Sequence, residues 1–179
     1  MKILDGLKWK LASSGRGATV IKGVVLHWTA SKTLSSALSW MSTARKGSYH
    51  YVIDVDGVVT KCVPTSRKAW HTGRDGKRAN LCPKDEGVAE GIANEVSIGI
   101  SFVNPGDKTP LTSRQIESVK TLVDMLKHFI PTLDWITTHH ECCPSARPTE
   151  LLMEYTQWDW KIASQWSGLK VWTRPKNLG

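Results

Sequence analysis

The sequence predicts an α/β fold in which a mixed central β-sheet is flanked by helices. Three apolar runs, at residues 20–28, 96–103 and 133–138, have the length and composition of buried strands. Between them, residues 33–41 and 112–130 carry apolar side chains at helical spacing. Because strands and helices alternate along 179 residues, of which 40% are apolar, we expect one sheet and one domain.

Turn and cap signals mark the remaining elements. Thr33 precedes the first helical repeat and is a candidate N-cap. An Asp-Gly turn predicts that residues 49–63 form a β-hairpin. Residues 13–17 are expected to form a loop, and the polar stretch 73–93 a second, longer loop, which at this length is expected to be either functional or mobile. The last helix is expected at about residues 149–165.

The net charge of +8 favours a polyanionic partner, such as nucleic acid, an anionic membrane face or an anionic cell wall. No signature of an RNA- or DNA-binding motif is present, so no nucleic-acid partner is expected. No apolar stretch approaches the roughly 20 residues that span a bilayer, and the first residues lack the apolar run of a secretion signal. We therefore expect a protein made in the cytoplasm with reduced thiols.

A cluster of potential metal ligands follows the strand at residues 133–138. His139, His140, Cys142 and Cys143 fall within five residues, and imidazole and thiolate are the ligands that zinc prefers. A further ligand must come from elsewhere, and His27, at the end of another apolar strand, is the best candidate. The alternative is a chance cluster whose cysteines pack as small hydrophobic side chains, since the spacing is not that of a zinc knuckle.

Five segments carry a resemblance to a known family. They are residues 25–30, a strand ending in histidine; 48–57, a Tyr-His pair running into a hairpin; 69–73, a Trp-His motif; 94–100, a strand; and 138–145, a second histidine followed by Cys-Pro. In this order they resemble the type 2 N-acetylmuramoyl-L-alanine amidases, which cut peptidoglycan. The resemblance covers residues 20–165 and implies the mixed sheet of that family and of the related peptidoglycan recognition proteins.

The resemblance implies a catalytic Zn²⁺ held by His27, His139 and Cys143, with the fourth position open for water. It implies that Tyr49 orients this water or hydrogen-bonds the oxyanion. His140 is the alternative ligand if the register slips by one residue.

The resemblance places substrate contacts on Trp70, His71 and Asn94. No lysine stands where the family has a catalytic one, and Arg147 is the candidate to stabilise the oxyanion as a fixed charge. A second register, in which Glu150 rather than Cys143 is the third ligand, also remains open.

The resemblance also implies a biological role. We expect one catalytic domain over residues 1–179, a core at about 20–165, and a tryptophan-rich C-terminal tail packed on that core. Its partner would be peptidoglycan, and the protein would act as a monomer. The size, charge and missing signal suit a phage or prophage endolysin, made in the host cytoplasm and released through a holin-type route. The alternative is a non-catalytic peptidoglycan-binding module of the same fold.

Overall fold

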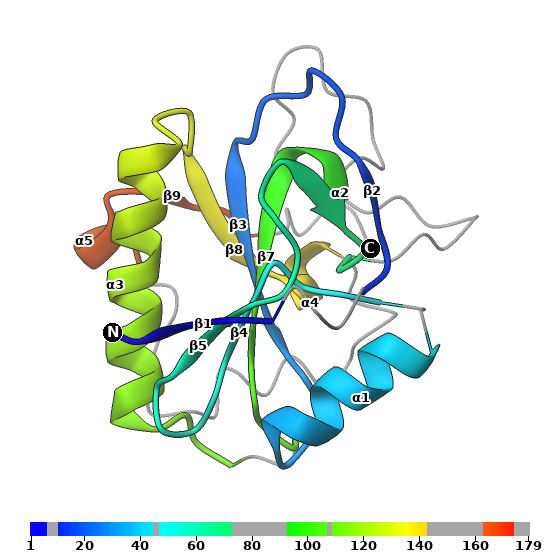
Figure 1. The fold of residues 1–179 in the computed structure, drawn as a ribbon. Helices are drawn as coiled ribbons and strands as arrows, with labels where there is room; N and C mark the ends of the chain where they lie inside the picture. Colours follow the sequence, from blue (N-terminus) through cyan, green and yellow to red (C-terminus); the bar gives the residue numbers. More distant parts are fainter. Residues whose placement is uncertain (7–10, 45–46, 73–92, 107–108, 143–162, 174–179) are drawn as a thin grey trace.

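The structure of the chain, a computed structural model, describes residues 1–6, 11–44, 47–72, 93–106, 109–142 and 163–173. Its centre is a seven-stranded mixed sheet with the strand order β1-β5-β4-β7-β3-β8-β9 (Figure 1). The strands are β1 (Ile3–Asp5), β3 (Gly23–Trp28), β4 (Tyr51–Ile53), β5 (Val59–Lys61), β7 (Ser97–Phe102), β8 (Trp135–Thr138) and β9 (Lys170–Val171). The predicted fold class, a mixed sheet flanked by helices, is confirmed.

The middle of the sheet is parallel. Strand β3 pairs in parallel with both β7 and β8, and β4 pairs in parallel with β7. The hairpin predicted at residues 49–63 is present as the antiparallel pair β4–β5, and Gly57 in its turn has a φ of 83°, which favours glycine. Because the parallel strands end at one edge, the residues that follow β3 and β8 are brought together there.

Helices cover both faces of the sheet (Figure 1). On one face lies α3 (Ser113–Phe129), which Thr112 begins with a capping box, and its apolar side packs on β3, β4 and β7. On the other face lies α1 (Leu34–Ala44), whose buried residues Leu38 and Met41 contact a smaller cluster. Thr33 accepts a hydrogen bond from the Ser36 amide and so acts as the predicted cap. Three short helices complete the described chain: α2 (Ala93–Val96), α4 (His139–Cys142) and α5 (Ala163–Ser167).

The expectation of a plain loop at residues 13–17 was wrong. Strand β2 (Ser13–Gly15) pairs in antiparallel with β6 (Arg67–Ala69) as a separate two-stranded sheet. Each strand has three residues and polar side chains, so neither shows the alternation that reveals a strand in sequence.

Two predicted elements fall largely beyond the described residues, namely most of the loop at 73–93 and most of the helix at 149–165. No helix among the described residues is long and apolar enough to cross a membrane.

Candidate active site

Three histidines from distant parts of the chain meet at one edge of the sheet. The ring centroid of His27, near the end of β3, lies 4.8 Å from that of His139, the first residue of α4, and 5.0 Å from that of His71. All three side chains are buried. His27 and His139 are the two histidines predicted to bind one metal, and His139 rather than its half-buried neighbour His140 joins the cluster.

Strand pairing explains this meeting. Leu26 is in register with Thr138, so the residues that follow them, His27 and His139, lie next to each other across the parallel β3–β8 pair. His71 lies over β7, where Gly99 leaves room for its ring. A Cβ atom on Gly99 would stand 2.6 Å from the His71 Cγ atom, closer than any ordinary contact. The absence of a side chain at this position is therefore what allows His71 to approach His27.

The His71–Thr72 segment is fixed by hydrogen bonds. His27 Nε2 lies 2.9 Å from His71 Nδ1, and His71 Nε2 lies 3.3 Å from Ser97 Oγ. The Asn94 side-chain oxygen accepts from the His71 amide at 3.0 Å, and from the Thr72 amide and hydroxyl at 2.9 Å each. His139 Nε2 lies 3.3 Å from the Thr72 carbonyl oxygen. One short segment thus contacts both predicted metal ligands.

Beneath this segment lies a buried arginine that sequence reasoning did not single out. The guanidinium of Arg16 donates to five backbone carbonyls, those of Thr65, Arg67, Asn94, Glu95 and Ser97. Burial lowers the pKa of Arg16 to about 10, although the Glu95 carboxylate acts to raise it, so the group stays charged at neutral pH. It therefore ties the β2 side of the molecule to the start of β7.

His50 joins this network. Its Nδ1 accepts from the Gly99 amide at 2.9 Å, and its Nε2 lies 3.0 Å from the Arg67 carbonyl oxygen and 2.9 Å from Arg16 Nη2. Burial, and then the charge of Arg16, lower the pKa of His50 to about 3.

The pKa of His71 is also lowered well below its usual value, first by burial and then by electrostatic interactions with His50, His139 and Arg16. Both rings are therefore neutral at physiological pH.

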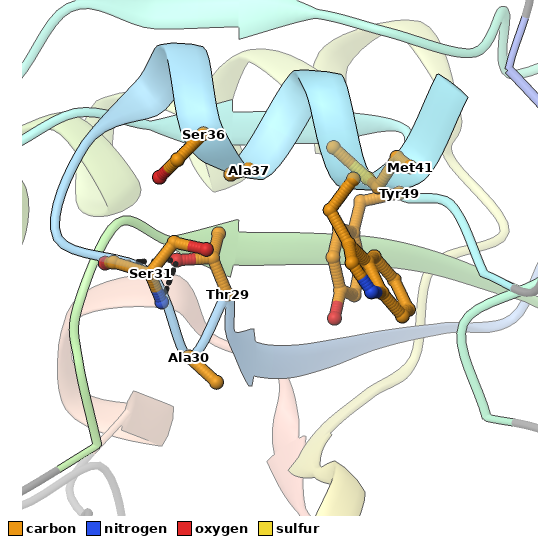
Figure 2. Close-up of a pocket in the computed structure, with 8 residues that line it drawn as sticks. Thr29, Ala30, Ser31, Ser36, Ala37, Met41 and Tyr49 are labelled. Carbon is orange, nitrogen blue, oxygen red and sulfur yellow. Dashed lines mark hydrogen bonds between the residues drawn. The ribbon is translucent and has the colours of Figure 1, made fainter. Parts of the chain in front are cut away.

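Tyr49, the predicted catalytic tyrosine, lies beside the cluster with its ring centroid 5.0 Å from that of His27. Its hydroxyl donates to the Trp28 carbonyl oxygen over a long 3.4 Å. The same tyrosine borders a cavity of about 470 Å³ between α1 and the segment that follows β3 (Figure 2). The cavity is lined by Thr29, Ala30, Ser31, Ser36, Ala37, Trp40, Met41 and Tyr49. An open space, whose lining among the described residues is uncharged, therefore adjoins the histidine cluster.

The remaining predicted site residues differ in their surroundings. Trp70 is 42% exposed, and its indole nitrogen donates to Ser14 Oγ at 3.1 Å, so it is accessible at the surface. Cys143, Arg147 and Glu150 lie outside the described residues. Among the residues that the structure describes, no three His, Cys, Asp or Glu side chains are arranged to hold a metal ion. His27 and His139 could supply two ligands, and both candidates for the third belong to the segment outside the description.

The sequence model of the family described as N-acetylmuramoyl-L-alanine amidase matches residues 17–149. The chain belongs to this family. The match includes His27, His71 and His139, so the histidine cluster of this amidase-family chain lies within the shared region. No curated protein sequence matches the chain.

Solved structures share the fold of this amidase-family chain at low sequence identity. The Ph2119 endolysin, from bacteriophage Ph2119 of Thermus scotoductus, is 19% identical over 93% of this chain and 99% of its own, with a TM-score of 0.61. Drosophila peptidoglycan recognition protein SA is 16% identical over 97% and 95%, with a TM-score of 0.63.

A third structure, the amidase AmiD from E. coli, is in complex with its substrate anhydro-N-acetylmuramic acid-L-Ala-D-γ-Glu-L-Lys. It is 21% identical over 87% of this chain and has a TM-score of 0.59. The match spans 61% of the AmiD chain. At these identities the three likenesses establish the fold.

Proposed function

We propose that the chain is a zinc-dependent N-acetylmuramoyl-L-alanine amidase, which hydrolyses the amide bond between N-acetylmuramic acid and L-alanine in peptidoglycan. The observation that carries the proposal is the meeting of His27 and His139, whose ring centroids lie 4.8 Å apart in a buried site. These two residues are 112 positions apart (139 − 27), and the family resemblance had assigned both to one metal.

The donor set fits zinc. His27 and His139 offer imidazole nitrogens side by side, and three protein ligands with one open position are the catalytic pattern. Cys143 is proposed as the third ligand, with Glu150 as the alternative. Zinc, when bound, lowers the pKa of water towards ~7 and polarises a carbonyl group. The residues of the chain then have to orient the scissile amide and stabilise the negative charge that develops on its oxygen.

Tyr49 is suited to such a role. Its ring centroid lies 5.0 Å from that of His27, and its hydroxyl is a hydrogen-bond donor that a substrate oxygen can accept from. Arg147, outside the described residues, is proposed to add a fixed positive charge. Arginine keeps its proton, its pKa being above ~12, so the proton for the leaving amine must come from another source.

The cavity beside Tyr49 supports binding of a saccharide. Ser36, Ala37 and Met41 line it from α1, and Thr29 and Ser31 line it from the segment that follows β3 (Figure 2). Trp40 is a further lining residue. An aromatic ring and hydroxyl groups, with no charged side chain among the described residues of the lining, suit a neutral sugar better than a carboxylate. The exposed Trp70 is proposed as a further substrate contact. The charge of +8 suits an anionic wall, and the fold shared with a phage endolysin supports an origin as an endolysin.

The test is to measure zinc content and wall cleavage in site variants. His27→Ala and His139→Ala are each expected to lose bound zinc by elemental analysis. They should also lose more than about a hundredfold in the release of peptides with an N-terminal L-alanine from purified sacculi, because water is no longer activated. His128→Ala, on α3 at the opposite face of the sheet, is the matched control and should keep both properties. Comparing Cys143→Ala with Glu150→Ala then identifies the third ligand.

A wild-type chain that binds sacculi but releases no such peptides would contradict the amidase proposal. That result would favour the alternative, a peptidoglycan-binding module without activity.

A further inference from the structure

The segment His71–Thr72 stands against both proposed zinc ligands. His71 Nδ1 lies 2.9 Å from His27 Nε2, and the Thr72 carbonyl oxygen lies 3.3 Å from His139 Nε2. The neutral imidazole of histidine carries its proton on one nitrogen and a lone pair on the other, and only the lone pair can bind a metal. The hydrogen-bond partners at Nε2 of His27 and His139 therefore decide which nitrogen of each ring can bind the metal.

For His139 the answer follows from the partner alone. A backbone carbonyl oxygen can only accept, so the Nε2 atom of His139 must carry the proton and donate it to Thr72. The lone pair of a neutral His139 ring is then on Nδ1.

For His27 the answer follows from a chain of three hydrogen bonds. The Ser97 hydroxyl has one proton and donates it to the Ala93 carbonyl oxygen, which cannot donate in return. Ser97 Oγ therefore accepts from His71 Nε2, 3.3 Å away, which leaves the lone pair of His71 on Nδ1. That lone pair accepts from His27 Nε2, and the lone pair of His27 is again on Nδ1.

The acceptors are held in place. Asn94 Oδ1 accepts three hydrogen bonds from His71 and Thr72. The His71 ring packs against Gly99, where a side chain would leave no room for it. His71 itself is 4% exposed and both of its ring nitrogens have partners, so its ring has little surface to offer a substrate.

We propose that His71 is a positioning residue that fixes the tautomer of His27 so that Nδ1 is presented to the metal, as the Thr72 carbonyl does for His139. This inference rests on the proposed function for the identity of the metal. It assigns His71 a role through His27, in place of direct contact with substrate. Outer partners of this kind change metal affinity by about 10- to 100-fold when they are removed.

Two substitutions separate positioning from simple packing. In His71→Asn the amide oxygen can occupy the place of Nδ1 and accept from His27, whereas in His71→Ala no acceptor remains. We expect His71→Ala to bind zinc about 10- to 100-fold more weakly than wild type in competition with a chelator. The zinc affinity of His71→Asn should stay much closer to that of wild type. The control His128→Ala should have the same zinc affinity as wild type.

The tautomers can be read without metal or activity. In the full-length chain freed of metal and labelled with ¹⁵N-histidine, the imidazole nitrogen shifts should give the Nε2–H form for His27, His71 and His139. The His27 signal should become a mixture of tautomers in His71→Ala and should return to the Nε2–H form in His71→Asn.

A His27 ring protonated on Nδ1 in the wild-type chain, or equal zinc affinity in His71→Ala and wild type, would overturn the inference. If the wild-type chain bound no zinc, the proposed function would fail, while the shifts would still decide whether His71 fixes the His27 tautomer.

Discussion

The two faces of strand β7 are equally buried and chemically opposite. Ile98, Ile100 and Phe102 point into the apolar core beneath α3. Ser97, Gly99 and Ser101 alternate with them and point to the histidine side, where Ser101 is in register with His27. A strand buried on both sides would normally be apolar throughout. The difference teaches that β7 contributes apolar packing on one face and uses the other to hold a polar site.

Neighbouring substitutions on β7 test this division, and the largest effect on stability is expected on the apolar face. Ile100→Ala should lower the free energy of unfolding by about 2–5 kcal/mol, because it leaves a cavity in the main core. Ser101→Ala should change it by less than about 0.5 kcal/mol, or raise it, because Ser101 Oγ is buried and has no hydrogen-bond partner among the described residues. Chemical denaturation of both variants measures the contrast, and comparable losses would mean that the faces do not divide in this way.

A pair of glycine substitutions sharpens the comparison on the polar face. Gly99→Ala would bring a Cβ within 2.6 Å of His71 Cγ, and we expect a loss of about 1–3 kcal/mol as the ring is displaced. Zinc affinity should fall with it, because His71 loses its position against His27. Gly47→Ala is the matched control, since its Cβ would meet nothing closer than the Trp70 carbonyl oxygen at 3.5 Å. If Gly99→Ala kept full zinc affinity, the absence of a side chain at position 99 would not be needed for zinc binding.

The apolar face and two of the site histidines were predictable from sequence for the same reason. Buried strands are visible as apolar runs, and parallel strands end at one edge, so histidines that follow two such runs are expected to meet. His27 and His139 fulfil this expectation. The capped helix at 112–130 was predictable because its apolar spacing extends over several turns.

The supporting residues could not be predicted in the same way. Arg16 lies in a Ser-Gly segment without periodicity, and only the fold brings five carbonyls around its guanidinium, those of Thr65, Arg67, Asn94, Glu95 and Ser97. Gly99 looks like an ordinary strand glycine until His71 is seen to lie on it. Their roles depend on contacts between residues far apart in the chain, and no local pattern records such contacts.

A smaller effect on the polar face should appear as a dependence of stability on pH. The pKa of His50 is lowered from 6.5 to about 3 in the folded chain, by burial and by the charge of Arg16. Between pH 6.5 and 3 the unfolded chain therefore binds a proton at this histidine that the folded chain does not. The part of the folding stability that depends on a neutral His50 is fully present above pH 6.5. It falls by about 1.4 kcal/mol per pH unit as the pH decreases through this window.

The variant His50→Asn isolates this contribution. Asparagine can accept from the Gly99 amide in place of His50 Nδ1 but does not titrate, so its stability should fall less steeply with decreasing pH. The free energy of unfolding, measured by denaturant at pH 6.5, 5.5 and 4.5 with a chelator present, should differ in slope from wild type by about 1.4 kcal/mol per pH unit. Because the other titrating groups are common to both chains, the difference reports His50 alone. Parallel slopes would mean that His50 takes up a proton in the folded chain at the same pH as in the unfolded chain, contrary to its burial beside the charge of Arg16.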